Sequence, residues 1–496
     1  MNSAGAQLLD VVIVGAGISG ISAACYLKMQ CPKKRFRIIE SRGSLGGTWD
    51  LFRYPGIRSD SDMHTFGFKF KPWTRAKSIS DGPSILTYLN ETVDEYAVRD
   101  SIDFGVRVTS ARWLSAESVW ETVARDGRGR EIRYRSRLLF MCTGYYRYSS
   151  GYTPELPGLE EFAGTVVHPQ LWPEDLDYSN KRVAVIGSGA TAVTLIPAMA
   201  DKAFHVTMVQ RSPTYIVSMP GKDKLANFLS RLLPTTWAYA SIRWRNIRFQ
   251  NYFYKQAIGR PAKTRAYILK RLRKALKPEI DIEKHFTPSY DPWTQRLCLV
   301  PDSDLFHVLN SGKANVITGT IERITSDGIE MQDGEKIEAE VLVTATGIQL
   351  ELLGGVDFFM DDKKLDFSQR FFYQGMMFSG VPNLIQTFGY INASWTLRAD
   401  LNSEFVCALL KRMDETGTTQ CVPLLRDFEL EMAGQDWVTD FNPGYLKRGN
   451  HLFPRQGSHS PWHNTQDYLL DLKLLAGGPP DDGVLQFQKT GKADSA

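Results

Sequence analysis

The sequence lacks paired cysteines, a leader-like start and a long apolar run. Its six cysteines are far apart and none forms a C-x-x-C pair, which supports neither a redox dithiol nor a zinc site. The first five residues have neither the basic region nor the apolar core of a signal peptide. Residues 8–27 are apolar on average, but Asp10 and three glycines interrupt them as a strand, turn and helix would. We therefore expect a cytoplasmic protein with reduced, mostly buried thiols and no membrane span.

The sequence also has little excess of positive over negative charge. The 59 Lys and Arg residues nearly balance 55 Asp and Glu, and the net charge of +4 gives no reason to expect a nucleic-acid partner. A chain of 496 residues is too long for one ordinary core and suggests roughly three folding units. Its content of 43% hydrophobic and 23% charged residues is ordinary for a soluble globular enzyme.

A first dinucleotide site is predicted near the N-terminus. A short apolar strand leads into the pattern Gly15-x-Gly17-x-x-Gly20, and a helical stretch follows. The first glycine suits a tight turn, the second lets the backbone approach a pyrophosphate, and the third lets helix and strand pack closely. The next strand, 36–40, ends in Glu40, whose carboxylate can accept hydrogen bonds from a ribose hydroxyl. This acid suits either FAD or NAD.

A second site of the same kind is predicted in the middle of the chain. Residues 181–192 repeat the strand, turn and helix with Gly187, Gly189 and Ala192, and alanine is permitted at the third position. We expect a second nucleotide to bind here.

The end of the following strand, 205–210, indicates which nucleotide binds at the second site. Gln210 stands where the first unit has an acid, and Arg211 and Ser212 come directly after it. A guanidinium and a hydroxyl can hold a charged 2′-phosphate, so NADPH is favoured over NADH. The alternative is that Arg211 is a solvated surface residue.

The segment between the two sites carries a resemblance to a known family. Residues 162–173 read F-x-G-x-x-x-H-x-x-x-W-P, from Phe162 to Pro173, and resemble the signature of type I Baeyer-Villiger monooxygenases. Gly46-Gly47-Thr48-Trp49 resembles the flavin-proximal G-G-x-W segment of FAD-binding monooxygenases. Thr143-Gly144 and Thr346-Gly347 resemble the crossing strands of two-dinucleotide flavoproteins.

Longer stretches are similar to the ethionamide-activating branch of this family. They are residues 46–73, 173–218, 291–301 and 389–395. The resemblance implies an α/β fold with two Rossmann-like dinucleotide-binding domains.

The implied domains interrupt one another along the chain. Residues 1–147 and 346–496 would form the FAD-binding domain, residues 148–215 and 296–345 the inserted NADPH-binding domain, and residues 216–295 a helical insertion within the latter.

The resemblance also implies a chemistry. In the family NADPH reduces FAD, O2 forms a C4a-peroxyflavin, and this species converts a ketone to an ester or lactone. Arg296 matches the family's active-site arginine, whose permanent cation can stabilise the oxyanion. Asp60 matches the aspartate that orients this arginine. The alternatives are S-oxygenation of sulfides or thioamides, and NADPH oxidase or reductase activity.

Several other residues are expected either to lie near the flavin or to have a structural role instead. Asp62 and Arg58 are expected to form an ordinary loop salt bridge, which is also the alternative for Asp60. His168 is expected to hold chain crossings together rather than to move a proton. We expect six further residues to contact or line the flavin site, namely Gly47, Thr48, Trp49, Tyr54, Asn392 and Trp395. For the larger side chains the alternative is packing in the core.

One departure from the family concerns the residue before Arg296. Many members have a lysine there that contacts the 2′-phosphate, whereas this chain has Gln295. Arg211 would then carry more of the preference for NADPH, and discrimination against NADH would be modest.

The segment 224–278 contains no acid at all. Fourteen lysines and arginines alternate with aromatic residues there, and Pro234 and Pro261 suggest several short helices. Basic charge with aromatic side chains suits an anionic membrane surface, so peripheral membrane contact is one reading. A solvated helical cap over the substrate channel is the other.

Overall fold

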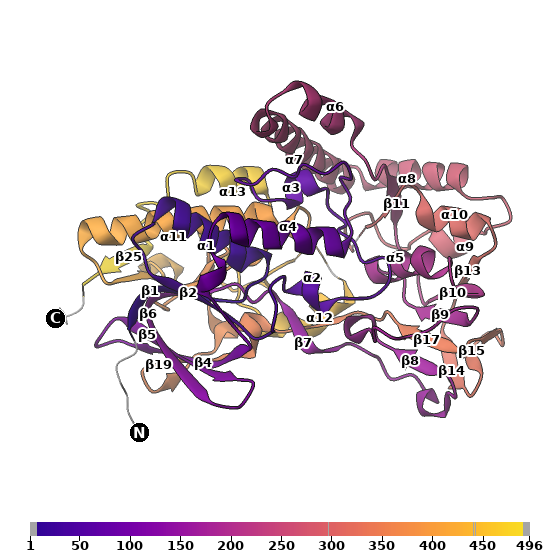
Figure 1. Cartoon of the computed structure of the whole chain (residues 1–496), viewed down its shortest axis with the longest axis horizontal. Helices are drawn as coiled ribbons and strands as arrows, with labels where there is room; N and C mark the ends of the chain where they lie inside the picture. Colours follow the sequence, from indigo (N-terminus) through magenta and orange to yellow (C-terminus); the bar gives the residue numbers. More distant parts are fainter. Residues whose placement is uncertain (1–6, 296, 440, 442, 490–496) are drawn as a thin grey trace.

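A computed structural model describes residues 7–295, 297–439, 441 and 443–489 of the chain. It contains two units built on parallel strands, placed next to each other along the longest axis, with a ridge of helices across one side (Figure 1). The predicted α/β class with two Rossmann-like units is therefore found. The residue boundaries of the domains remain a prediction.

The larger sheet has the strand order β20-β19-β4-β5-β6-β1-β2-β3, and β23 pairs with β6. Strands β1, β2, β3, β6 and β23 run parallel, whereas β4, β5 and β6 form an antiparallel meander. The strands are β1 (Leu8–Val14), β2 (Phe36–Glu40), β3 (Ile102–Phe104), β4 (Val106–Leu114), β5 (Val119–Asp126), β6 (Glu131–Met141), β19 (Asp357–Met360), β20 (Lys363–Lys364) and β23 (Leu384–Gln386).

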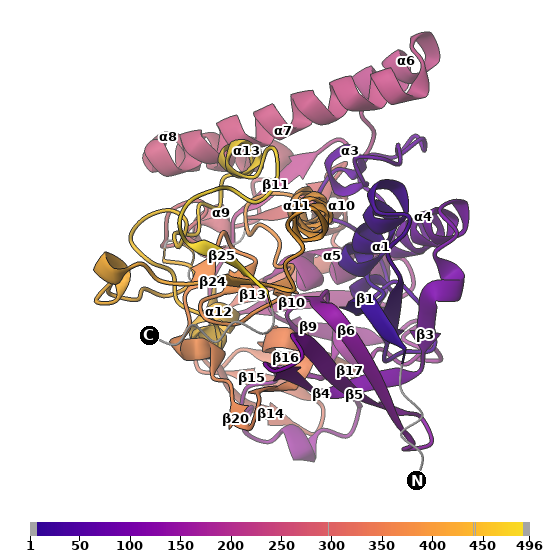
Figure 2. The same ribbon diagram turned by 90° about the vertical axis from the view of Figure 1, so that its left-hand side faces the viewer.

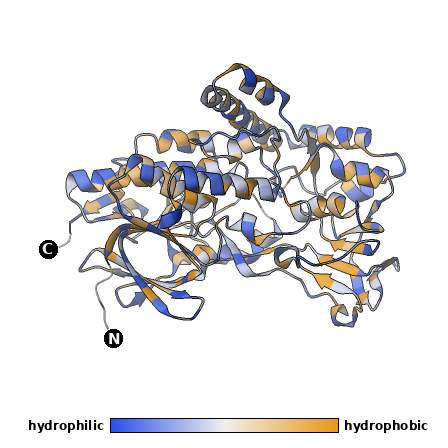
Figure 3. Cartoon of the chain, in the orientation of Figure 1, coloured by the Kyte–Doolittle hydropathy of each residue, from blue (hydrophilic) through white to orange (hydrophobic). Residues whose placement is uncertain are grey.

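Helices cover one face of this sheet (Figures 1 and 2). They are α1 (Ile18–Gln30), α4 (Gly82–Glu95) and α11 (Trp395–Thr416). The apolar run of β1 is buried because helices lie on one side of it and packed aromatic side chains on the other. Figure 3 shows the same pattern, with hydrophobic residues concentrated in the strands and on the inner faces of the helices.

The smaller sheet is parallel throughout, in the order β13-β10-β9-β17-β8. Its strands are β8 (Thr165–Val167), β9 (Arg182–Ile186), β10 (His205–Gln210), β13 (Ala314–Thr318) and β17 (Val341–Thr344). Helices α5 (Ala190–Met199) and α10 (Asp304–Asn310) pack against it. Beside it lie the antiparallel strands β14 (Ile321–Thr325), β15 (Gly328–Met331) and β16 (Lys336–Glu338), and the parallel pair β11 (Ile216–Met219) and β12 (Cys298–Pro301).

The chain crosses between the two units through β7 (Tyr146–Gly151) and β18 (Ile348–Leu350), which pair antiparallel with each other. His168 lies at this crossing. Its Nε2 donates to the carbonyl of Gly347 at 3.1 Å and its Nδ1 accepts from the amide of Gln170 at 3.2 Å. Burial lowers the pKa of His168, so the ring is neutral and acts as a hydrogen-bonded brace.

A ridge of helices follows β11, formed by α6 (Lys224–Leu232), α7 (Thr235–Gly259) and α8 (Pro261–Ala275). It lies along the outside of the molecule (Figure 2). The breaks fall at Pro234 and Pro261 as predicted, but the expectation of only short helices is wrong. Helix α7 has 25 residues because neither proline nor a mid-helix glycine interrupts it.

The remaining elements lie outside the two main sheets. They are α2 (Thr48–Leu51), α3 (Met63–Phe66), α9 (Ile282–Phe286), α12 (Gly444–Gly449), α13 (Tyr468–Leu474), β21 (Phe372–Tyr373), β22 (Met377–Phe378), β24 (Gln420–Pro423), β25 (Leu485–Gln488) and short 3-10 turns.

The six cysteines are buried and unbridged. Within the described residues, no helix combines the length and apolar character that a membrane crossing needs. The same residues hold no cluster of three His, Cys, Asp or Glu side chains suited to a metal ion.

Candidate functional site

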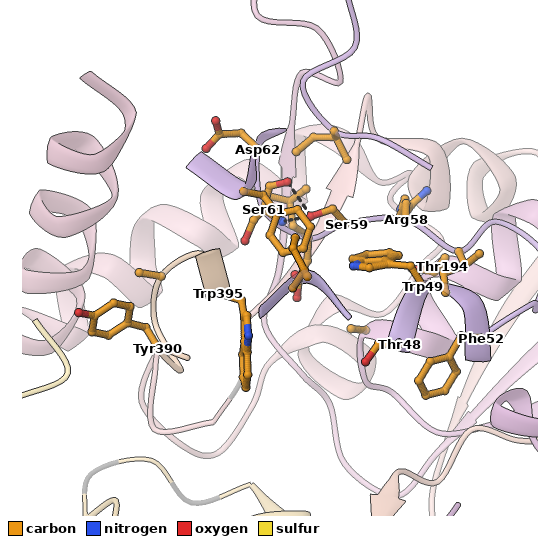
Figure 4. Close-up of a pocket in the computed structure, with 18 of the residues that line it drawn as sticks. Thr48, Trp49, Phe52, Arg58, Ser59, Ser61, Asp62, Thr194, Tyr390 and Trp395 are labelled. Atoms are coloured by element: carbon orange, nitrogen blue, oxygen red, sulfur yellow. Dashed lines mark hydrogen bonds between the residues drawn. The ribbon is translucent and has the colours of Figure 1, made fainter. Parts of the chain in front are cut away.

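A large cavity of about 1720 Å³ lies where the two units and the ridge of helices meet. Its walls come from the first glycine loop, the segment 46–62, the start of α5, the inner face of α7 and the start of α11. Figure 4 shows part of them, with residues of the segment 46–62, Thr194 of α5 and Trp395 of α11. The cavity collects most residues predicted for the first site, namely Gly15, Gly17, Glu40, Gly47, Thr48, Trp49, Tyr54, Asp60, Asn392 and Trp395.

The first glycine loop is shaped by close backbone contacts. Gly15 has a φ of +105°, and a Cβ there would lie 2.7 Å from the carbonyl oxygen of Cys142. A Cβ on Gly20 would lie 1.9 Å from the carbonyl oxygen of Gly15. Helix α1 then begins after Gly17 without a side-chain cap. Its first amides are therefore available to an anion at the helix N-terminus.

A second glycine segment closes against this loop. A Cβ on Gly47 would lie 3.0 Å from the Cα of Gly17, and the amide of Gly46 donates to the carbonyl of Ala16 at 3.0 Å. Two backbones without side chains thus face the cavity at the start of α1. Such a cradle fits the pyrophosphate of FAD.

Glu40 is fixed at the cavity wall by two backbone amides. Its Oε2 accepts from Ala16 at 2.7 Å, and its Oε1 accepts from Arg42 at 2.8 Å. Burial raises the pKa of this carboxyl, and the two amides oppose that shift by favouring the charged form. The carboxylate is thus held in position where it can also accept from a ribose hydroxyl, as the sequence predicted.

Of the two predicted catalytic residues, Asp60 and Arg296, the structure describes only Asp60. Asp60 lines the cavity near Tyr54, whose phenol is hydrogen-bonded to Thr191. Burial raises the pKa of Tyr54, so its phenol stays protonated. Arg296 lies outside the described residues, and its position relative to Asp60 remains a prediction.

The expected salt bridge between Arg58 and Asp62 is wrong. Arg58 instead forms an ion pair with Asp304 at the start of α10. Asp62 caps α3, where its Oδ1 accepts from two amides at 3.1 Å, and it also accepts from Asn246 and Gln250 of α7 at 2.9 Å. The partners found in the structure are thus 184 to 246 residues away along the chain, whereas the predicted ones were local.

The aromatic walls of the cavity are fixed by specific contacts. The indole of Trp395 donates to Ser19 Oγ at 2.7 Å and stacks on Tyr145 with ring centroids 5.4 Å apart. Trp49 makes an edge contact with Phe66 at 5.6 Å. Figure 4 shows Trp49 and Trp395 on different elements that both border the cavity. Flat apolar walls of this kind suit an aromatic ring system such as a flavin.

Trp293 is a cavity residue that the sequence did not single out for this role. Its ring packs edge-on against Tyr254 with centroids 5.5 Å apart. Its indole Nε1 is buried and has no hydrogen-bond partner among the described residues. A buried donor left without a partner costs free energy, and a bound polar group would remove that cost. Gln295, two residues later, is half-buried.

The second glycine loop is formed as predicted but does not line the cavity. Gly187 has a φ of +141°, and a Cβ there would lie 2.3 Å from the carbonyl oxygen of Ala345. A Cβ on Gly189 would meet nothing within 4 Å, which leaves open space beside the start of α5. Ala192, one turn into α5, is buried against the sheet. The loop therefore fits a second dinucleotide beside the cavity.

The end of β10 also differs from the first unit in its contacts. Gln210 is buried, and its amide donates to the carbonyl of His285 at 2.7 Å and to Thr318 Oγ1 at 2.9 Å. Its amide hydrogens are thus directed into the protein. Arg211 and Ser212 are exposed immediately after it, where a 2′-phosphate could reach them.

The interpretation of residues 224–278 as a helical cap over the substrate channel did not name the residues of α7 that line the site. Arg245, Asn246, Phe249, Gln250 and Phe253 all line the cavity. They lie at spacings of one, three and four residues, which put them on one face of a helix. The mixture of polar and aromatic residues on this face gave no signal that separated it from the exposed faces.

Two family models and many known proteins match this chain. Residues 13–80 match a family model described as an NAD(P)-binding Rossmann-like domain, and residues 79–282 match one described as flavin-binding monooxygenase-like. The chain is 49% identical over 486 residues to the FAD-containing monooxygenase EthA of Mycobacterium tuberculosis (strain ATCC 25618 / H37Rv), covering 97% of this chain and 98% of that protein. It is 45% identical over 482 residues to the probable FAD-binding monooxygenase AlmA of Acinetobacter baylyi (strain ATCC 33305 / BD413 / ADP1), covering 97% and 96%.

Solved structures share the fold. An open crystal structure of cyclohexanone monooxygenase has a TM-score of 0.72 at 22% identity, covering 84% of this chain and 90% of that one. An oxidized steroid monooxygenase bound to NADP has a TM-score of 0.70 at 23% identity, covering 84% and 88%. The predicted fold class, the resemblance to flavin monooxygenases and the choice of FAD and NADP as cofactors are confirmed at the level of the family. With nearly half of its residues identical over almost its whole length, the chain belongs to the family of FAD-containing monooxygenases.

Proposed function

We propose that this chain is a Baeyer-Villiger monooxygenase that uses NADPH and O2 to convert ketones into esters or lactones. The observation that carries the proposal is the linker 162–173, which has every position of that signature. Its His168 braces Gly347 at the second crossing, and Gln170 donates to the carbonyl of Arg147 at 2.7 Å in the first crossing. The signature thus stands at the joint between the two nucleotide units.

In this proposal the protein's own part is to bind, orient and shield. Bound flavin supplies the activated oxygen once NADPH has reduced it. Arg296 stabilises negative charge on the substrate oxygen with a cation that stays protonated. Asp60, at the cavity wall beside Tyr54, orients that arginine. Trp49 and Trp395 form apolar walls that keep water from the reacting atoms.

A paired product analysis tests the proposal. The holoenzyme is given a ketone and a sulfide of matched size, with NADPH and ¹⁸O2, and the products are analysed by mass spectrometry. An ester or lactone with one ¹⁸O atom supports the proposal. A sulfoxide without any ester would instead indicate the S-oxygenase alternative. NADPH oxidation without an oxygenated product would indicate an oxidase or reductase.

The variant Arg296→Ala tests the assigned cation. We expect its oxygenation rate to fall on the order of a hundredfold or more, because charge on the substrate oxygen loses its stabiliser. Anaerobic reduction of the flavin by NADPH should stay close to the wild-type rate. Gln295→Ala is the matched control, since it changes the neighbouring residue without removing a charge. Full ester formation by Arg296→Ala would contradict the role.

We also propose that the basic segment 224–278 brings the enzyme into peripheral contact with a membrane. Its charge supports the proposal, because fourteen basic residues and no acid lie in this segment. Substrates would be small molecules, either ketones or sulfides, with O2 as the second substrate.

A further inference from the structure

Helix α6 carries an apolar stripe that is exposed at the surface of the protein. Leu225, Phe228 and Leu232 are exposed, at spacings that place them on one side of the helix. Leu232 is 64% exposed, and Leu233 follows it at the surface. Leucine and phenylalanine side chains gathered in this way usually mark a contact surface.

The outer side of α7 continues the surface. Trp237, Trp244 and Tyr252 are exposed at spacings of seven and eight residues, so they lie on one side of the helix. Trp237 is 71% exposed. The guanidinium of Arg248 lies 4.5 Å from the ring centroid of Trp244. Tryptophan and tyrosine beside basic residues are typical of groups that sit at a membrane interface.

The charge around this surface favours one kind of partner. Fourteen of the chain's 59 lysines and arginines and none of its 55 acids lie in 224–278, which leaves the rest of the chain with a net charge of −10. Two copies that met through the same basic surface would repel each other. An anionic phospholipid surface would attract it, because basic segments bind negatively charged headgroups.

The same helices border the cavity. Leu225 and Lys224 at the start of α6 line it, together with Lys222 just before and Phe249 and Phe253 of α7. In both views α6 and α7 form the outer edge of the molecule (Figures 1 and 2). One wall of the cavity is therefore continuous with the exposed apolar stripe of α6.

We propose that α6 and the outer side of α7 dock on an anionic phospholipid bilayer, and that apolar substrates enter the cavity from the lipid beside α6. Leu225, Phe228, Leu232 and Trp237 insert among the headgroups, while the exposed basic residues beside them, Lys224, Arg231 and Arg248, contact phosphates. The substrate class is a water-insoluble molecule that partitions into the bilayer, a part of the inference that rests on the proposed oxygenase function.

Vesicle sedimentation of the FAD-loaded full chain tests the docking. Vesicles of phosphatidylcholine alone are compared with vesicles that contain 30% phosphatidylglycerol, each at low and at high salt. We expect sedimentation with the anionic vesicles at low salt and little with the neutral ones. Equal sedimentation with both, or none with either, would overturn the proposal. Loss of sedimentation together with a dimer in size-exclusion chromatography would assign the surface to a second copy instead.

A matched pair of variants locates the surface. Leu232→Asp places a charge in the α6 stripe, and we expect about a tenfold or greater loss of vesicle affinity. Leu430→Asp is the control, since Leu430 is 66% exposed and far along the chain from the ridge. The control should bind as the wild type does. If both variants lost vesicle affinity equally, or if neither lost any, the assignment to α6 would be contradicted.

Turnover distinguishes substrate entry from docking alone. With a long-chain ketone dissolved in the vesicles, Leu232→Asp should lose activity about as much as it loses vesicle affinity. With a short water-soluble ketone its activity should equal that of the wild type, because Leu232 does not line the cavity. Unchanged turnover of the vesicle-borne ketone would overturn the entry route. If no ketone is oxygenated, the proposed function fails, while the sedimentation result still decides the docking.

Discussion

Arg243 Nη2 lies 3.1 Å from Asp400 Oδ2, and both side chains are almost wholly buried. The pair joins α7 to α11, two helices that belong to the ridge and to the first nucleotide unit. Arg243 Nη1 also donates to the carbonyls of His64, Thr65 and Gly67, at 3.0, 3.1 and 2.7 Å. One buried guanidinium thus holds the ridge against the segment that leads into the large cavity.

Replacing Arg243 should strongly destabilise the fold. Arg243→Met leaves the Asp400 carboxylate buried without its cation, which costs about 3–5 kcal/mol in comparable cases. The free energy of unfolding in urea measures the effect. The control is Arg273→Met, which breaks the exposed ion pair with Glu283 and should cost at most about 1 kcal/mol. Similar losses in the two variants would show that the buried pair has no special weight.

Substitutions at two glycines of the second loop should distinguish an effect on folding from an effect on cofactor binding. Gly187→Ala forces a Cβ to within 2.3 Å of the Ala345 carbonyl oxygen, so we expect a marked fall in stability. Gly189→Ala has open space around its Cβ and should fold normally. It should nevertheless raise the KM for NADPH, because its methyl group occupies the approach of the pyrophosphate. Thermal unfolding and steady-state kinetics check both. A normal KM in Gly189→Ala would contradict binding at this loop.

Arg211 should carry much of the preference for NADPH. The side-chain amide of Gln210 is occupied by His285 and Thr318, so it is not available to the cofactor. The exposed guanidinium of Arg211 is therefore the predicted partner of the 2′-phosphate. Arg211→Ala should lower kcat/KM for NADPH about tenfold or more, in line with a lost charge-assisted hydrogen bond. The value for NADH should change little. An equal loss with both cofactors would assign Arg211 a structural role.

Glu429 should give the fold an acid-sensitive contribution. Burial raises the pKa of its carboxyl, but hydrogen bonds from Arg426 and His459 outweigh this and hold the pKa at about 2, below the ordinary 4.5. Because the pKa is lower in the folded protein than in the unfolded chain, the charged carboxylate stabilises the fold at pH values above 4.5. This stabilisation is lost as the pH falls from 4.5 toward 2. We expect about 1 kcal/mol of this contribution to disappear between pH 7 and pH 4.

The variant Glu429→Gln isolates that contribution. It should be less stable than the wild type at pH 7, and the difference between the two should shrink as the pH falls to 4. The free energy of unfolding in urea at several pH values measures the difference. A constant difference over this range would contradict the pKa assignment.

Local patterns explain why much of the fold and part of the site could be predicted. The loops at Gly15 and Gly187, and Glu40 at the end of β2, depend on residues that lie close together in sequence. Strand, turn and helix therefore follow from a short pattern whose physical reasons are the same in every chain.

Long-range partners explain what could not be predicted. Asp62 accepts from Asn246 and Gln250, and Arg58 pairs with Asp304, at sequence separations of 184 to 246 residues. Nothing in the sequence around Asp62 distinguishes these partners from Arg58, which lies four residues away. Likewise, nothing in the residues of α7 marks Arg243 as the side chain that holds this helix against α3, where it donates to the carbonyl of His64 at 3.0 Å.

The two crossings between the nucleotide units are bonded to each other through β7 and β18. Gln349 Nε2 donates to the Gly151 carbonyl at 2.9 Å, and Arg147 donates to Gln349 Oε1 at 2.9 Å. Because the two connections are hydrogen-bonded to each other, they form one joint between the units instead of two independent linkers. Any hinge motion that brings a nicotinamide on the second unit toward the first would have to bend both connections together.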